Sequence, residues 1–230
     1  MDVVAALGGQ SLSNPENILP KLARAMIEDI SDTGASVSVA AQISAMISRI
    51  ASREEYDVVL IDSRAGLSEL AAPAVIGLGA TALLFGTAQK QTIEGYRALF
   101  AALRPLAQRD RVFGRDADWR AMLRPVYAKA SLDPDVADRF RDDIYELYSG
   151  FIYDAELVGE DDSDSLRFSR DDKEAPHWPL VVPFSPNFVD FDPGRIPNQL
   201  TQSFYEQSYR SFLNGIDTIV GDTRMMGGAR

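Results

Sequence analysis

The 230-residue sequence contains no cysteine and a single histidine, His177. The lack of cysteine excludes a disulfide framework and a thiolate metal site. One histidine excludes metal sites built from several imidazoles and leaves little basis for a Ser-His-Asp triad. We expect His177-Trp178-Pro179 to form a packed loop rather than to carry a catalytic base.

The chain is also short of positive charge. It has 23 lysines and arginines against 34 acidic residues, a formal net charge of −11. Binding of nucleic acid over a broad surface needs clustered cations, so this composition argues against direct nucleic-acid binding, although a local basic patch stays open. Asp154–Pro176 concentrates acidic residues and serines, which predicts a solvated, partly mobile loop.

Signals for export or membrane insertion are equally scarce. Met1–Gly9 lacks the basic segment of a signal peptide. Leu70–Ala88 is uncharged, but it contains Pro73 and three glycines, so a helix, a loop and a strand explain it better than a membrane span. We therefore expect a cytoplasmic protein with no membrane span.

The most informative segment is Tyr56–Ser68. Val58–Ile61 is an unbroken apolar run that predicts a strand buried on both faces of a parallel sheet. The run ends at Asp62, where a carboxylate could hold Mg²⁺ beside a nucleotide phosphate. Gly66 has no Cβ, so its N–H could approach a phosphate oxygen closely. Asp62 could equally be the cap of a following helix, and spacing alone does not choose.

Apolar periodicity predicts an α/β fold, with a mostly parallel sheet and helices on both faces. We expect a single domain over residues 1–230: a helical lead-in (1–55), core βαβ units (56–130), a helix with the acidic loop (131–179), and the last strand with a closing helix (180–230). Besides Val58–Ile61, the expected strands are Ala80–Gly86, Leu123–Ala130 and Leu180–Pro183. The expected helices are Asn14–Ile30, Ser38–Ser52, Leu67–Leu78, Gln91–Leu106, Asp135–Ile152 and Ile196–Ile219.

The segment Tyr56–Tyr96 resembles the Walker B region of the ParA/MinD-type P-loop ATPases. It is most similar to the branch that reads Asp-Ser-Arg-Thr-Gly, although Ala65 replaces the threonine here. The strand Ala82–Gly86 and the following Gln89–Gly95 extend the resemblance, which becomes looser towards Ile216. The resemblance implies a P-loop NTPase-like fold and ATP with Mg²⁺ as ligands.

The resemblance also implies roles for individual residues. Asp62 would be the Walker B acid that holds Mg²⁺, directly or through water, and places the attacking water. Ser63, Arg64 and Gly66 would respond to the γ-phosphate, although Arg64 could instead pair with a surface acid. Pro183, Phe184 and Pro186 would shape a slot for the purine, or form a tight turn. The remaining candidates support the ligand or contact a partner: Gln89, Lys90 and Lys129, the last standing where the family often has an asparagine.

The chain departs from this family in one respect that limits its chemistry. No Gly-Lys pair occurs in it, and Gly8-Gly9-Gln10-Ser11 is the nearest sequence to a Walker A loop. A Walker A loop needs the lysine charge on the phosphates. We therefore expect the C-terminal part of such an ATPase, without the first strand and P-loop, which is deficient in hydrolysis alone and uses ATP and Mg²⁺ only if that loop is supplied.

Two other hypotheses remain open at this point. The chain could be a non-catalytic regulatory or interaction module of the same fold. It could also be an unrelated α/β enzyme that uses Asp62 and Arg64 on a phosphorylated substrate. The resemblance further implies a homodimer or a partner protein, and an open sheet edge would favour association.

Overall fold

The computed structural model describes residues 29–30, 36–37, 39–52, 56–62, 79–112, 118–154 and 165–227. The chain divides into two compact units. The first comprises Met1–Ser63 and Ser68–Leu78, and the second comprises Arg64–Leu67 and Gly79–Arg230. Three predicted elements or sites lie outside the described residues: most of the helix from Asn14, the helix Leu67–Leu78, and Ser63, Arg64 and Gly66.

The described residues of the first unit form one helix and one small ladder. Helix α2 spans Val39–Ala51, which confirms the helix predicted over Ser38–Ser52. Strand β1 (Asp29–Ile30) pairs antiparallel with β2 (Ser36–Val37). The prediction that a helix reaches Ile30 is therefore wrong, because the backbone of Asp29 and Ile30 pairs with β2.

The predicted strand at Val58–Ile61 is wrong. Tyr56–Asp62 has no regular secondary structure, and Val58, Val59, Leu60 and Ile61 are 46%, 51%, 87% and 46% exposed. A parallel strand exists only when neighbouring strands satisfy its N–H and C=O groups, and none of the described strands pairs with this segment. An apolar run therefore was not enough to place it in a sheet.

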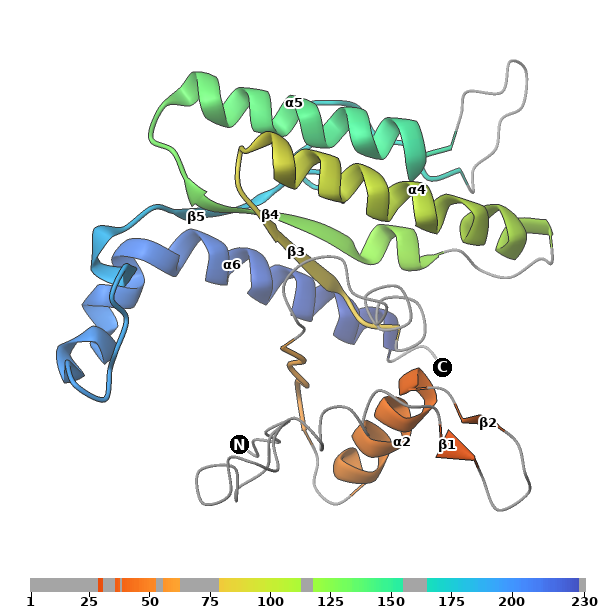
Figure 1. Ribbon diagram of the computed structural model, residues 1–230, viewed down its shortest axis with the longest axis horizontal. Coiled ribbons are helices and arrows are strands. Elements are labelled where there is room, and N and C mark those ends of the chain that lie inside the picture. The colour runs from red at the N-terminus through yellow and green to blue at the C-terminus, as the bar shows by residue number, and fades with distance from the viewer. Residues whose placement is uncertain are drawn as a thin grey trace. The chain divides into compact units, whose positions relative to one another are not determined.

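The second unit is built on a parallel sheet of order β3-β4-β5 (Figure 1). Strands β3 (Ala82–Gly86), β4 (Leu123–Ala130) and β5 (Leu180–Pro183) confirm three of the four predicted strands. Both ladders are parallel. The first runs from Ala82 opposite Leu123 to Gly86 opposite Tyr127, and the second begins with Val126 opposite Leu180. The chain thus has a mixed α/β fold, in which helices connect successive parallel strands.

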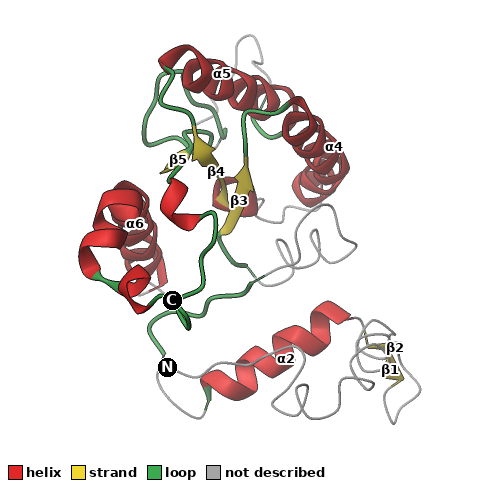
Figure 2. Cartoon of the chain, turned by 60° about the vertical axis from the view of Figure 1, so that its left-hand side comes forward, coloured by secondary structure: helices red, strands yellow, loops and turns green. Residues whose placement is uncertain are grey.

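Helices cover both faces of this sheet (Figure 2). Helix α4 (Lys90–Val112) connects β3 to β4, and α5 (Pro134–Phe151) lies between β4 and β5 in the sequence. These two helices pack against each other on one face, and α6 (Gln202–Gly227) lies on the other. Asp133 caps α5 by accepting a hydrogen bond from the Asp135 N–H at 3.0 Å. The N–H groups in the first turn of a helix have no partner within the helix, and the Asp133 side chain supplies one here. An aspartate followed by proline therefore favours the start of a helix at this point.

The core of the second unit lies between the sheet and the α4–α5 face. The Tyr148 hydroxyl donates to the Leu123 carbonyl at 2.8 Å, and the Tyr148 ring contacts Phe100 edge-on at 5.1 Å. Each of the two helices buries a stripe of apolar residues at helical spacing. The buried residues are Ile93, Tyr96, Leu99, Phe100, Leu103, Phe140, Ile144, Leu147 and Tyr148.

Three other predictions need correction. Helix α4 passes through Pro105 and ends at Val112 instead of at Leu106. The closing helix begins at Gln202, after the 3₁₀ turns η3 (Pro186–Phe188) and η4 (Pro197–Leu200), and it runs past Ile219 to Gly227. The loop predicted to be solvated over Asp154–Pro176 is packed at its end, where Ala175 is 1% exposed, because residues 170–179 fold onto α5.

Candidate functional site

The carboxyl ends of the three parallel strands meet at one edge of the sheet. Helices α4 and α5 and the loop that leads to α6 all begin on this side (Figure 1). Ligands of open α/β sheets bind outside this edge, because loops and helix N-termini converge there. Six of the predicted site residues belong to this edge: Gln89, Lys90, Lys129, Pro183, Phe184 and Pro186.

The end of β3 is held tightly against α4. Gly86 has no room for a side chain, because a Cβ would collide with the side chains of Thr92 and Tyr96. The Tyr96 hydroxyl donates to the Leu84 carbonyl at 2.6 Å, and the Thr87 N–H donates to Thr92 Oγ1 at 3.4 Å. This packing fixes where the first turn of α4 lies.

Gln89 and Lys90 form the start of that helix. The Gln89 carbonyl accepts hydrogen bonds from the N–H groups of Thr92 and Ile93 at 2.9 and 3.3 Å. The side chains of both Gln89 and Lys90 are exposed. Lys90 is the first residue of a 23-residue helix, and the positive N-terminal end of a helix favours a negative group nearby.

Lys129 has the most unusual backbone of the described residues, where it is the only non-glycine with a positive φ, 52°. It occupies a bulge: Ala128 is opposite Val182, and Ala130 is opposite Pro183. The left-handed conformation costs an L-residue about 1–2 kcal/mol. Such strain persists where the surroundings impose it, commonly at functional sites. The sequence Tyr-Ala-Lys-Ala offers no glycine or asparagine that would have indicated this conformation.

The end of β5 presents an aromatic ring. The Phe184 N–H donates to the Ala130 carbonyl at 3.0 Å, which continues the β4–β5 pairing by one bond. The Phe184 ring is nevertheless 53% exposed. Pro186 begins the 3₁₀ turn η3, whereas Pro183 is the last residue of β5. Leu132, which follows β4, is 93% exposed at the same edge, and sequence reasoning missed it.

Asp62 is described in the first unit, at the end of the exposed Tyr56–Asp62 segment. Asp62 is exposed, and no strand leads into it among the described residues, so its predicted position at the carboxyl end of a parallel strand is wrong. The sheet edge therefore brings together six of the predicted site residues, all from the second unit. Among the described residues, no group of three or more histidine and acidic side chains is arranged to hold a metal ion.

His177 takes no part in this edge. Its side chain is buried, with the residue only 2% exposed. Its Nε2 lies 3.0 Å from the Arg170 carbonyl and must donate to it, so Nδ1 accepts from the Tyr153 hydroxyl at 2.6 Å. Burial lowers the pKa of His177 and raises the pKa of Tyr153. A neutral imidazole with both nitrogens engaged is a packing residue, in agreement with the prediction.

Comparisons with protein-family models, with curated proteins and with solved structures return no match. Of the helices in the described ranges, none has the length and apolar character needed to cross a bilayer. The function must therefore be argued from the sheet edge itself. Two ammonium groups, a helix N-terminus and an exposed aromatic ring form a surface suited to a ligand that carries both phosphate and a flat ring.

Proposed function

We propose that the second unit is a ParA/MinD-like nucleotide-binding domain, with ATP as its ligand at the carboxyl edge of the β3-β4-β5 sheet. The observation that carries the proposal is the gathering of Lys90, Lys129 and Phe184 at the ends of three adjacent parallel strands. The ammonium groups would face the phosphates, and the Phe184 ring would lie against the base.

The proposed domain is deficient in hydrolysis by itself. Its sequence has no Gly-Lys pair, so the described edge supplies lysines without the backbone cradle of a Walker A loop. We also propose, on the resemblance of Asp62-Ser63-Arg64-Ala65-Gly66 to Walker B alone, that Asp62 is an acid that holds Mg²⁺. This role belongs to the first unit and is not part of the edge described for the second unit. Bound Mg²⁺ would offset phosphate charge.

Titration with a fluorescent ATP analogue in the presence of Mg²⁺ tests this proposal. We expect saturable binding that unlabelled ATP displaces. We expect Phe184→Ala and Lys129→Ala each to weaken it by about tenfold, the effect of losing one central contact. Lys173→Ala is the matched control and should leave affinity unchanged. Lys173 is exposed and adjoins Glu174, whose carbonyl accepts a hydrogen bond from Arg124 at the start of β4, the opposite end of that strand.

The second candidate is a non-catalytic interaction module of the same fold. It is favoured by the missing Walker A lysine and by the large apolar side chains left exposed outside the sheet. Lack of nucleotide binding by a protein with a normal circular dichroism spectrum and cooperative unfolding would reject the nucleotide-binding proposal and select this candidate.

A further inference from the structure

The loop between β5 and α6, residues 184–201, exposes more large apolar side chains than a connection requires. Val189 is 66% exposed, Phe191 44% and Ile196 44%, in addition to Phe184. Single exposed apolar residues are ordinary on protein surfaces, whereas several in one short segment mark an interaction site. We call residues 189–192, Val-Asp-Phe-Asp, the loop tip.

The loop tip is held rigidly by a buried glutamine. Gln199 is 7% exposed, and its side-chain amide donates to the Asp190 carbonyl at 3.1 Å. Its side-chain oxygen accepts from the Asp192 N–H at 2.8 Å. The Asp192 carbonyl in turn accepts from the Ile196 N–H at 2.9 Å. Both sides of Phe191 are therefore fixed.

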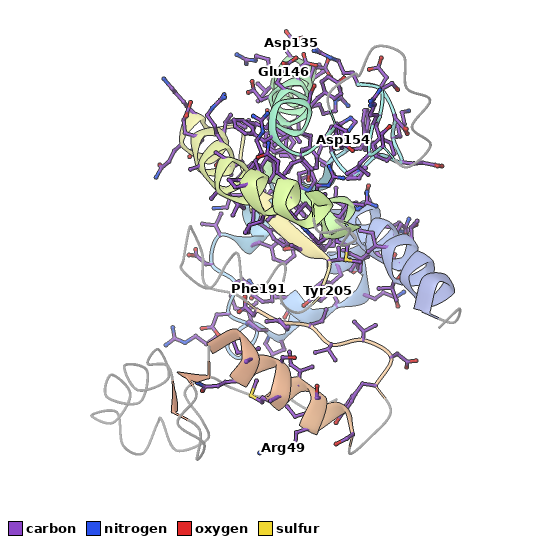
Figure 3. The ribbon with its side chains drawn as sticks, turned by 90° about the vertical axis from the view of Figure 1, so that its right-hand side faces the viewer. Arg49, Asp135, Glu146, Asp154, Phe191 and Tyr205 are labelled. Carbon is purple, nitrogen blue, oxygen red and sulfur yellow. The ribbon has the colours of Figure 1, made fainter. Side chains whose placement is uncertain are left out.

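Two neighbouring aromatic rings of the loop differ in their surroundings: Phe188 packs against α6, and Phe191 is exposed. Phe188 contacts Tyr209 of α6 edge-on at 4.9 Å and lies 6.5 Å from Tyr205. Phe191 is 5.5 Å from Phe188 but keeps almost half of its surface exposed, and Figure 3 labels it together with Tyr205. The backbone that carries the exposed ring is thus held on both sides, so binding through it would lose little backbone entropy.

We propose that the loop tip is a docking site for a protein segment that presents apolar side chains flanked by lysine or arginine. Phe191 and Val189 would be its apolar anchors. Aromatic side chains in fixed positions commonly supply the largest share of binding energy at such sites.

Charge identifies the class of partner. Asp190 and Asp192 stand on either side of Phe191, and Arg195 approaches Asp192 at 3.8 Å with its own side chain 87% exposed. In the described ranges, no cation forms an ion pair with the Asp190 carboxylate. A second copy of this chain would bring the same carboxylates together, and anionic lipid or nucleic acid would be repelled. A basic segment would instead neutralise the carboxylates of Asp190 and Asp192.

A fluorescently labelled amphipathic peptide of leucine and lysine tests the proposal, with a peptide of leucine and glutamate as its counterpart. Anisotropy titrations should show that the leucine–lysine peptide binds and that the double variant V189S/F191S weakens it by about tenfold. Leu60→Ser is the matched control, since Leu60 is 87% exposed outside the loop, and it should bind like the wild type. Both variants keep Phe188 and Gln199, which hold the loop in place. The melting temperatures of V189S/F191S and Leu60→Ser should therefore agree with that of the wild type.

Several results would overturn the proposal. The first is equal binding of the leucine–glutamate peptide, and the second is equal loss of affinity in Leu60→Ser. A third is sedimentation with phosphatidylglycerol vesicles that V189S/F191S abolishes, which would make the loop tip a membrane anchor. A fourth is self-association in sedimentation velocity that the same variant removes, which would make a second copy the occupant. None of these outcomes bears on nucleotide binding at Lys129 and Phe184.

Discussion

Two segments of this chain have almost the same composition and opposite structures. Val58-Val-Leu-Ile61 has no regular secondary structure, pairs with no described strand and is largely exposed. Leu180-Val-Val-Pro183 is strand β5, hydrogen-bonded to β4. Both are short apolar runs with two adjacent valines, so the difference cannot come from the side chains of the runs themselves.

The difference comes from the neighbours of each segment. Strand β5 lies against β4, and α6 approaches so closely that a Cβ on Gly215 would collide with the Leu180 side chain. The described residues provide no such partner for Val58–Ile61. Burial of apolar area and completion of a hydrogen-bond ladder thus stabilise β5 together, and an isolated apolar run has neither.

The largest expected effect compares one leucine from each environment. Leu123 begins β4 and is 0% exposed, whereas Leu60 is 87% exposed. Leu123→Ala should lower the free energy of unfolding by about 2–5 kcal/mol, because it removes contacts and leaves a cavity. Leu60→Ala should change it by less than about 0.5 kcal/mol. Urea unfolding measures both, and a large loss for Leu60→Ala would mean that the segment is packed in solution.

The second effect uses two glycines that differ in the space around them. Gly86→Ala should destabilise the protein by about 1–3 kcal/mol, because Thr92 and Tyr96 must move. Gly95 lies within α4, and the position that an added methyl group would take has no neighbouring atom within 4 Å. Gly95→Ala should stabilise by about 0.5–1 kcal/mol, through helix propensity. Equal effects in thermal unfolding would show that α4 does not lie against the end of β3.

The third effect concerns pH and the only histidine. Burial lowers the pKa of His177 in the folded state, so the unfolded chain binds more protons as pH falls through the imidazole's ordinary range. Stability should therefore be complete above about pH 6.5 and decline below it, by at most about 1.4 kcal/mol per pH unit. His177→Gln should remove this part of the pH dependence.

Parallel urea titrations of the wild type and His177→Gln at a series of pH values would reveal the difference. Titration of the carboxylates affects both proteins equally, so it cancels in the difference between their free energies of unfolding. If the two profiles run parallel between pH 5 and about pH 6.5, the packed, neutral imidazole described here is incorrect.

The smallest effect is expected at Lys129. Lys129→Gly should raise the free energy of unfolding by less than about 1 kcal/mol, because glycine adopts a φ of 52° without strain but has more freedom in the unfolded chain. Lys129→Ala keeps the strained backbone and should show no such gain. Both variants remove the ammonium group, so comparison of the two separates the strain from the charge. Equal stability of the two variants would place the left-handed conformation in doubt.

Much of the second unit could be predicted from local patterns. The strands Leu123–Ala130 and Leu180–Pro183 have the predicted bounds, and the Asp133-Pro134 start of α5 follows from capping chemistry. The candidate site was only partly predictable. The edge position of Gln89, Lys90 and Phe184 follows from strand ends, but the bulge at Lys129 depends on pairing between β4 and β5, which no local pattern encodes. The prediction for Val58–Ile61 failed for the same reason, since its structure depends on a neighbouring strand.

Hydrogen exchange resolved by peptide, with and without ATP and Mg²⁺, tests the central claim most directly. We predict slow exchange in β4 and rapid exchange in Tyr56–Asp62 before ligand is added. ATP should then slow exchange at residues 129–131 and 184–186, where the strands end, and at the first turn of α4. Absence of any protection at these strand ends, with protection elsewhere in the chain, would contradict the proposal that the carboxyl edge of the sheet is the nucleotide site.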